Sequence, residues 1–177
     1  MKQLTKIVLT GPESVGKSTL TMQLSKSYRA PFVSEIARKY IEDLNRPYEL
    51  EDVLNIAKLQ IKEEEKHCSN QKGLLFLDTD LIVTKIWLKR VYNFVPDWID
   101  EYLISQPASL HLLCYPDLPW VYDPVRENPE SRLELFNEYK TEIEKLDIQY
   151  SVILGENKER FNNALKSVIK YSGIKPI

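Results

Sequence analysis

The feature that most constrains the fold of this chain is a glycine-rich segment that follows an apolar run near its start. The segment matches the pattern G-x-x-x-x-G-K-[ST], whose four fixed positions are Gly11, Gly16, Lys17 and Ser18. An apolar run over residues 5–10 precedes it, and a helical pattern follows it. Strand, glycine-rich loop and helix in this order are the context that a phosphate-binding P-loop requires.

The fixed positions of this motif have distinct chemical tasks. Glycine lets backbone N–H groups approach phosphate oxygens closely, and the N-terminus of the following helix favours negative charge. Lys17 would reach the β- and γ-phosphates of a nucleoside triphosphate, while the Ser18 hydroxyl would ligate magnesium. The residues of this segment that we expect to bind the nucleotide are Gly11, Glu13, Ser14, Val15, Gly16, Lys17, Ser18 and Thr19.

The rest of the chain has the pattern of a parallel sheet wrapped by helices, because short apolar or β-branched runs alternate with helical patterns. A length of 177 residues fits one domain with a substantial core. We therefore predict one α/β domain over residues 1–177, with a P-loop NTPase fold and a five-stranded parallel sheet. The expected strands are residues 5–10, 31–34, 73–78, 109–115 and 150–154.

Amphipathic patterns predict the helices that cover this sheet. Residues 51–67 place apolar side chains at i, i+3, i+4 and i+7 on one face. In the segment "ENPESRLELFNEYKTEIEKL", Asn128 can cap a helix and Pro129 suits its first turn. Two further helices are expected to begin near Thr79 and near Asn157.

Composition argues against several classes of protein. The net charge of −2 is unlike that of a chain whose main partner is a nucleic acid, since such binding depends on many Lys and Arg contacts. No apolar run reaches the length of a signal peptide or a membrane span. Cys68 and Cys114 form no C-x-x-C pair and are expected to be reduced thiols. We expect a cytoplasmic protein with no membrane partner, and both a monomer and a homo-oligomer remain open.

Acidic residues follow two of the predicted strands. Asp78 and Asp80 end the run "GLLFLDTD", and an acid at the end of a strand beside a P-loop holds magnesium directly or through water. Glu35 follows the second strand, with Arg38 one turn later. Open α/β sheets bind ligands outside the carboxyl ends of their strands, so Glu35, Asp78 and the P-loop should face one crevice. Glu35 and Asp80 are both candidates to accept a proton from an attacking hydroxyl.

A helix that begins near Thr79 would align three different side chains. Asp80, Thr84 and Trp87 then lie at i, i+4 and i+7, which places a carboxylate, a hydroxyl and an indole on one face. We interpret this face as part of a substrate site. Core packing of Trp87 and simple helix capping by the aspartates are the alternatives.

A proline-rich segment interrupts the alternation of strands and helices. Five of the ten prolines fall between residues 107 and 129. Proline removes amide donors and disfavours helix in the residue before it, so we expect a loop from Tyr115 to Asn128 and a lid over about residues 116–130. A loop of this length inside a domain is usually functional or disordered.

Three arginines in or after this segment are candidates for contact with the nucleotide. Phosphoryl transfer spreads negative charge over the migrating group, and an arginine on a closing lid would stabilise it. We assign this catalytic role to Arg126 and expect Arg132 to contact the nucleotide. Arg160 follows the turn at Gly155, which would border the adenine or serve as a plain connection.

Other P-loop classes lack their signatures here. A GTPase would carry D-x-x-G and N-K-x-D, where this chain has "DTDL" and "NKER". An AAA-type motor would need a hydrophobic-Asp-Glu motif and a sensor domain, and adenylate kinase would need a D-G-x-P-R segment. None of these patterns is present, which favours a small kinase that uses ATP.

The segments "GPESVGKSTL", "SEIARKY", "LFLDTD…T…W", "YPDLPWVYDPVRENPESR" and "GENKERF" together resemble the kinase domain of the NadR type, the ribosylnicotinamide kinase family, an AAA-like ATP-binding domain. The likeness runs from Lys6 to about Phe161. It implies the strand order 2-3-1-4-5. It also implies transfer of the γ-phosphate of ATP to the 5′-hydroxyl of nicotinamide riboside, with magnesium, to give nicotinamide mononucleotide.

Two departures limit what this resemblance implies. The bifunctional members also have an adenylyltransferase domain with an H-x-G-H signature, whereas this chain has only His67 and His111, so that activity is not implied. They also tend to show Asp-Gly before the lid arginine, where this chain has Asp123 to Arg126 as "DPVR".

The expected acceptor is a nucleoside-like small molecule with a flat ring. The cationic ring of nicotinamide riboside would favour an aromatic face and a nearby carboxylate. Asp80 is a candidate acid, Thr84 a neighbouring hydroxyl, and the candidate aromatic faces are Trp87, Trp98, Trp120, Tyr40 and Tyr102. Another nucleoside kinase and a non-catalytic nucleotide-binding module remain alternative hypotheses.

Overall fold

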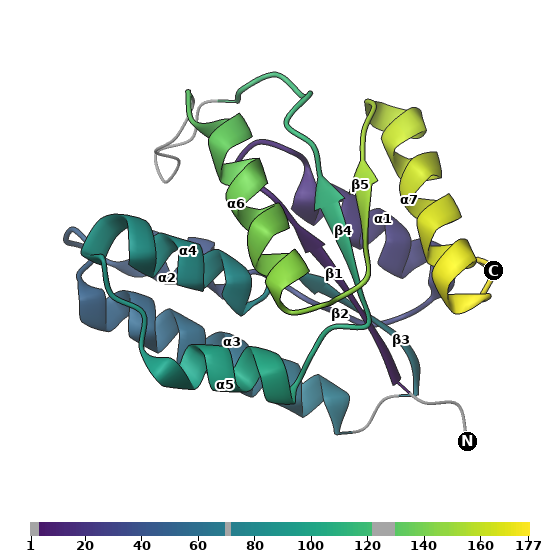
Figure 1. Ribbon diagram of the computed structural model, residues 1–177. Coiled ribbons are helices and arrows are strands. Elements are labelled where there is room, and N and C mark those ends of the chain that lie inside the picture. Colours follow the sequence, from purple (N-terminus) through teal and green to yellow (C-terminus); the bar gives the residue numbers. More distant parts are fainter. Residues whose placement is uncertain (1–3, 70–71, 122–129) are drawn as a thin grey trace.

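A five-stranded parallel sheet forms the centre of the computed structural model, which describes residues 4–69, 72–121 and 130–177 (Figure 1). The strand order is β2-β3-β1-β4-β5, as expected for the P-loop NTPase fold. Every pair of neighbouring strands is parallel. The strands are β1 (Leu4–Thr10), β2 (Phe32–Val33), β3 (Gly73–Asp78), β4 (Leu110–Cys114) and β5 (Tyr150–Ile153).

The inner strands are almost continuously apolar because helices cover both faces of the sheet. All five residues of β4 are buried, as are the last five residues of both β1 and β3. A strand buried on both faces shows no alternation of polar and apolar residues. This pattern explains why the sequence predicted these strands to within a residue.

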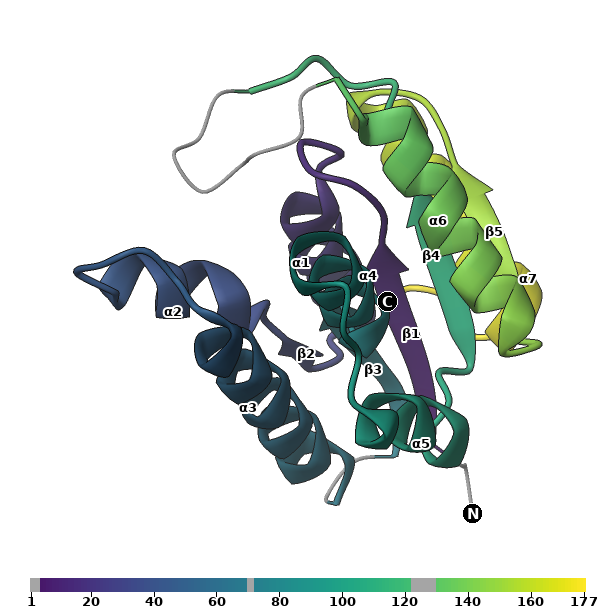
Figure 2. The ribbon, with the colours of Figure 1, turned by 60° about the vertical axis from the view of Figure 1, so that its left-hand side comes forward.

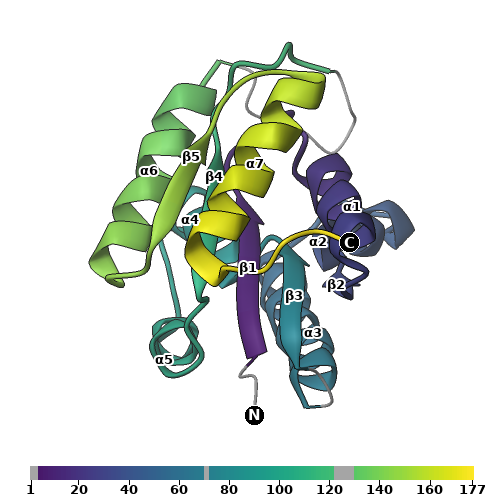
Figure 3. The same ribbon diagram turned by 90° about the vertical axis from the view of Figure 1, so that its right-hand side faces the viewer.

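Seven helices surround this sheet in the described part of the chain. Helices α1 and α7 cover one face and pack against each other (Figure 3), whereas α3, α4, α5 and α6 lie on the other face. On that second face, α4 lies between α3 and α6 (Figure 2). The helices are α1 (Lys17–Tyr28), α2 (Ile36–Asp43), α3 (Leu50–Cys68), α4 (Leu81–Tyr92), α5 (Asp97–Ser105), α6 (Arg132–Lys145) and α7 (Asn157–Ser172).

Most predicted helices lie within two residues of the observed ones, and one boundary differs in a way that matters. Helix α4 begins at Leu81 rather than near Thr79, because Thr79 has a left-handed backbone (φ +73°) and Asp80 is the N-cap. The predicted helix start at Asn128 and Pro129 lies outside the described residues, and the described helix begins at Arg132. None of the described helices is long and apolar enough to cross a membrane.

Two helices were not predicted, α2 and α5. The sequence of α5 does carry helix signals, since Asp97 and Asp100 lie in its first turn and Ile99 and Leu103 form a buried i, i+4 pair. Helix α2 has an apolar stripe of Ile36, Ala37, Tyr40 and Ile41, but it spans only eight residues and none of them is buried.

The P-loop leaves the sheet at Gly11, where only glycine fits. Its φ of +131° is a conformation that other residues rarely adopt, and a Cβ atom there would lie 2.7 Å from the carbonyl oxygen of Cys114. Further along the loop, Gly16 is also left-handed and is the N-cap of α1. These backbone conformations turn the chain sharply from β1 into α1, so the loop lies over the carboxyl edge of the sheet.

We expect the substitution Gly11→Ala to lower the free energy of unfolding more than Gly73→Ala does. Gly73 is also left-handed (φ +91°), but a Cβ atom there would meet no atom within 4 Å. Backbone strain alone costs about 1–3 kcal/mol, and the Gly11 variant must in addition displace the main chain of β4. Chemical denaturation of both variants measures the difference, and equal losses would contradict the proposed close packing.

Candidate functional site

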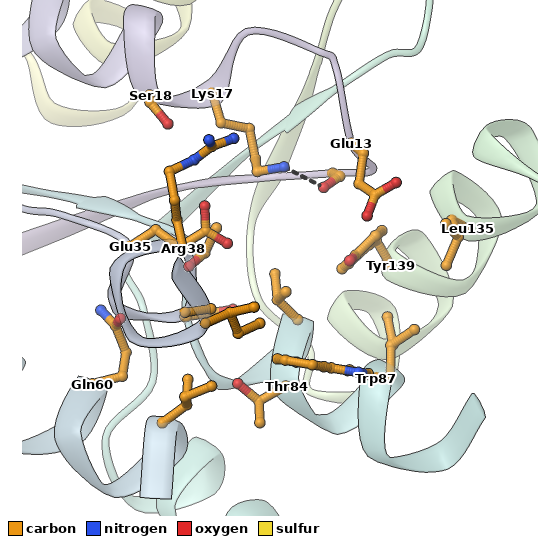
Figure 4. A pocket seen from close by; sticks show the side chains of 18 of the residues that line it. Glu13, Lys17, Ser18, Glu35, Arg38, Gln60, Thr84, Trp87, Leu135 and Tyr139 are labelled. Atoms are coloured by element: carbon orange, nitrogen blue, oxygen red, sulfur yellow. Dashed lines mark hydrogen bonds between the residues drawn. The ribbon is translucent and has the colours of Figure 1, made fainter. Parts of the chain in front are cut away.

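A pocket of about 720 Å³ opens at the carboxyl edge of the sheet, between the P-loop and the helices of one face (Figure 4). The P-loop and the start of α1 form one side of it. Helices α2, α3, α4 and α6 and the connection between α2 and α3 also line it. A volume of this size suits a small organic ligand. The pocket therefore joins a phosphate-binding loop to a chamber lined by other elements.

The lysine of the P-loop extends along the loop toward this chamber. The Nζ atom of Lys17 donates to the carbonyl oxygens of Gly11 at 2.9 Å and Pro12 at 2.8 Å. In Figure 4, Lys17, Ser18 and Glu13 line the loop side of the pocket, and Trp87 and Thr84 line the opposite side. The ammonium group is a positive charge beside the loop that would hold a phosphate, and Arg38 lines the same pocket.

Ser18 and Asp78 form a pair with the chemistry of a magnesium site. The hydroxyl of Ser18 donates to the carboxylate of Asp78, which is 4% exposed. Burial raises the pKa of Asp78, and the Ser18 hydrogen bond and the charge of Lys17 oppose that rise. The Oδ1 atom of Asp78 is buried and has no hydrogen-bond partner among the described residues. A free carboxylate oxygen beside a hydroxyl is a donor set that Mg²⁺ accepts.

The described residues include no cluster of three or more His, Cys, Asp or Glu side chains that could hold a metal. Magnesium in kinases is held by one or two protein ligands together with substrate phosphates. The residues present therefore fit a magnesium ion that binds together with a nucleotide.

Glu35 lies at the carboxyl end of β2, where it is the N-cap residue of α2 and lines the pocket. Burial raises the pKa of Glu35, the charge of Lys17 lowers it, and the charge of Asp78 raises it again. A carboxylate with a raised pKa is a better proton acceptor at neutral pH than an ordinary glutamate. Glu35 and the P-loop line one pocket, whereas the predicted third member, Asp78, is buried and is not among the residues that line it.

Asp80 both caps α4 and lines the pocket. Its Oδ1 atom accepts a hydrogen bond from the backbone N–H of Ile82 at 3.1 Å, and its Oδ2 atom lies 2.7 Å from Nε2 of His111. Thr84 and Trp87 line the same pocket, so the three predicted side chains do share one wall. Capping and pocket lining were alternatives at the level of the sequence, and the structure combines them.

An aromatic pair forms the wall opposite the P-loop. The rings of Tyr48 and Trp87 meet edge to face with centroids 5.0 Å apart, and Nε1 of Trp87 lies 3.3 Å from the Tyr48 hydroxyl. Tyr48 belongs to the connection between α2 and α3, where Arg46 makes a bidentate pair with Asp52 at 2.7 and 2.9 Å. That pair and the N–H of Glu49 lower the pKa of Asp52 to about 2. The connection is therefore anchored on α3.

Helix α6 completes the pocket from the other side. Leu135 and Tyr139 project into it, as Figure 4 shows. Arg90 at the end of α4 also lines the pocket and holds the two helices together, because its guanidinium bonds to Glu134 and Glu138 of α6 at 2.6 to 3.1 Å.

The sequence did not identify many of the residues that line the pocket, among them Arg46, Tyr48, Arg90 and Tyr139. The segment "NRPYELED" carries a turn proline and a capping box at Glu49 and Asp52, which could have marked a structured connection. Tyr139 is a buried residue of α6, 6% exposed, and it still borders the pocket. No local sequence pattern indicated that Arg90 lines a pocket, since its partners are more than forty residues away in sequence.

Some predicted aromatic residues do not line the pocket. The hydroxyl of Tyr40 lies 3.2 Å from Asp52, on the outer side of the connection. Trp98 and Tyr102 belong to α5 and are partly buried against the core cluster of this face. Trp120 lies 5.9 Å from the guanidinium of Arg132, near a smaller cavity beside the start of α6.

The three arginines that were predicted to contact the nucleotide lie in different places. Arg132 donates to the carbonyl of Leu118 at 2.8 Å and does not line the main pocket. Arg160 is 4% exposed and donates to the carbonyls of Gly155, Val15 and Tyr115, with an ion pair to Asp117. Its donors are thus used within the protein. Arg126 lies outside the described residues, as does most of the predicted lid.

The fold and the site define a P-loop nucleotide-binding protein. A family model described as an AAA domain matches residues 6–160, which is most of the chain. The chain therefore belongs to this AAA domain family. No curated protein shows a significant match to it.

Solved structures of NadR are similar to this chain over nearly all of its length. A crystal structure of NadR in complex with NR has a TM-score of 0.81 and 26% sequence identity, covering 98% of this chain and 53% of that one. NadR in complex with NAD and AMP-PNP has a TM-score of 0.74 and 25% identity, covering 98% and 51%. The chain spans about half the length of these NadR chains.

A deoxyadenosine kinase from M. mycoides has the same fold, with a TM-score of 0.66 and 16% identity, covering 94% of this chain and 100% of that one. The chain thus has the fold of a NadR-type P-loop kinase. These likenesses support a phosphotransferase of the nucleoside-kinase type that uses ATP.

We expect Glu35→Gln to raise the stability of the protein at neutral pH. The folded protein holds Glu35 with a pKa above its ordinary value of 4.5, so the ionised form is disfavoured in the folded state. The gain in stability over the unmodified protein should be absent below about pH 4. It should grow as the pH rises through the raised pKa of Glu35 and then stay constant. Thermal unfolding between pH 4 and pH 8 measures it.

The matched control for this experiment is Glu101→Gln, because Glu101 is exposed on α5 and remote from the pocket. Its unfolding temperature should follow that of the unmodified protein at every pH. If the unfolding temperature of the Glu35 variant had the same pH dependence as that of the control, burial would not raise the pKa of Glu35.

Proposed function

We propose that this chain is an ATP-dependent kinase that phosphorylates nicotinamide riboside to nicotinamide mononucleotide. The observation that carries the proposal is one pocket that joins a P-loop to a chamber with two aromatic rings and a carboxylate. The similarity to NadR in complex with NR supports the same acceptor. We further propose that residues 1–177 act as one kinase domain in the cytoplasm.

The donor side of the pocket binds ATP. Backbone N–H groups of the P-loop hold the phosphates, and Lys17 balances their charge. Ser18 and Asp78 would hold a magnesium ion, which would supply positive charge to offset that of the phosphates. Arg126 and Arg132, within and after the proline-rich segment, are proposed to contact the phosphates. Arg160 supports the loop by holding the carbonyl of Val15.

The acceptor side binds the nucleoside with its 5′-hydroxyl toward the P-loop. That oxygen attacks the γ-phosphorus of ATP, its proton passes to Glu35, and ADP leaves with the bridging oxygen. Glu35 takes this role rather than Asp80 because burial raises its pKa, whereas Asp80 already accepts hydrogen bonds on both oxygens. Asp80 and Thr84 instead receive hydroxyl groups of the ribose.

The ring of the acceptor packs against the pair of Trp87 and Tyr48. A cationic pyridinium ring gains electrostatic attraction from an indole or phenol face in addition to its apolar contact. An uncharged base would pack there as well, so another nucleoside kinase is the second candidate. The fold shared with deoxyadenosine kinase motivates this alternative.

The test of the proposed function is ADP release by the purified chain with ATP, magnesium and a panel of nucleosides. We expect nicotinamide riboside to stimulate ADP release more than adenosine, deoxyadenosine or thymidine does, and removal of magnesium with a chelator to abolish it. Lys17→Met should abolish turnover because it removes the charge that balances the phosphates. A different nucleoside as the best acceptor would replace the assignment, and no stimulated turnover would favour a non-catalytic nucleotide-binding module.

The role of the aromatic pair is tested with Trp87→Leu. We expect the KM for nicotinamide riboside to rise by about tenfold, and the KM for ATP to stay unchanged, because the lost cation–π contact lies on the acceptor side. Trp98→Leu is the matched control, since Trp98 lies in the same protein core but outside the pocket. Equal KM values for the two variants would remove Trp87 from the acceptor site.

A further inference from the structure

His111 is a fully buried histidine near the start of β4, and its ring pairs with the carboxylate of Asp80. Nε2 of His111 lies 2.7 Å from Oδ2 of Asp80, and the backbone N–H of His111 donates to the carbonyl of Gln149 at 2.9 Å. The side chain of His111 is 0% exposed, so it does not touch a ligand in the pocket. Any effect of His111 on a ligand therefore passes through Asp80.

Asp80 lies between His111 and the pocket. The N–H of Ile82 and the Nε2 of His111 each occupy one of its two oxygens. An ionised carboxylate offers about four lone-pair positions, so about two remain for other donors. Because Asp80 lines the pocket beside Thr84, those two positions are available to hydroxyl groups of a ligand.

A histidine at position 111 lowers the stability of the fold in a way that an apolar residue would not. Nδ1 of His111 is buried and has no hydrogen-bond partner among the described residues, and an unpaired buried polar atom lowers stability. The neighbouring positions Leu110, Leu112 and Leu113 are apolar and buried. Packing alone would favour another apolar side chain at this position, so the contact with Asp80 is what the histidine contributes.

We propose that His111 is a positioning residue for the acceptor site. It holds the carboxylate of Asp80 in one orientation, in which the remaining lone pairs receive the ribose hydroxyls of the nucleoside. The inference rests on the proposed function, because it assigns Asp80 to recognition of a nucleoside. Without the N–H of His111, the backbone of Ile82 is the one hydrogen-bond donor left to the carboxylate among the described residues, and the carboxylate can then rotate away from the ribose.

The test compares His111→Leu with His111→Gln in steady-state kinetics, with each substrate varied separately. His111→Leu should raise the KM for nicotinamide riboside by about tenfold, with the KM for ATP unchanged, because a hydrogen bond to a charged group is lost on the acceptor side alone. His111→Gln should restore most of the affinity, since its amide N–H reaches the position of Nε2. The free energy of unfolding is measured for both variants.

Leu113→Val is the matched control for loss of packing. Leu113 lies two residues along β4 on the same face and is fully buried, and its apolar side chain cannot form a hydrogen bond to Asp80. A double-mutant cycle with Asp80→Asn adds a second readout. In that background His111→Leu should leave the KM for nicotinamide riboside unchanged, because the group that it positions is already altered.

The outcomes separate this inference from the proposed function. If the unmodified chain phosphorylates no nucleoside, the proposed function fails and this inference fails with it. If the unmodified chain is active and His111→Leu has an unchanged KM for nicotinamide riboside, the inference alone is overturned. The same holds if Leu113→Val raises that KM equally, or if the effects of His111→Leu and Asp80→Asn simply add.

Discussion

The position of the phosphate-binding loop depends on the close contact between Gly11 and the main chain of Cys114. Because no Cβ atom intervenes, the end of β1 lies directly against the end of β4, and the loop continues from there over the edge of the sheet. Arg160 holds the other side of the loop through the carbonyl of Val15, and it also bonds to Tyr115 and to Gly155 beside β5. One buried guanidinium thus connects the loop to two neighbouring strand ends. The donor side is fixed by the sheet itself.

The three carboxylates around the loop have different surroundings, and these surroundings separate their tasks. Asp78 is buried beside a hydroxyl and keeps one oxygen without a protein partner, which suits a metal. Glu35 is partly desolvated and faces the charge of Lys17, which suits proton transfer. Asp80 is held by two donors, which suits recognition of hydroxyl groups. Sequence spacing placed all three near the loop but left open which of Glu35 and Asp80 is the base.

The sequence predicted the sheet well because buried parallel strands and the P-loop leave strong local patterns. It predicted Trp87 in the pocket because helical spacing from Asp80 fixes one face of α4. It did not identify Tyr48, since that residue reaches the pocket only through the path of an irregular connection. The sequence also could not decide which of Trp87 and Trp98 binds the ring, because both are aromatic residues beside one core. The packing of α4 against α5 distinguishes them. Contacts between distant segments, such as Arg90 with α6, leave no local pattern.

The acceptor wall and the donor loop are supported by different parts of the molecule. Tyr48 lies on the connection between α2 and α3, which is anchored by Arg46 and Asp52 and makes no ladder contact with the sheet. A change of length or residue type in this connection would therefore reshape the chamber for the ring while the phosphate loop kept its geometry. A protein with this fold can therefore change its acceptor specificity during evolution while its phosphate-donor site stays the same.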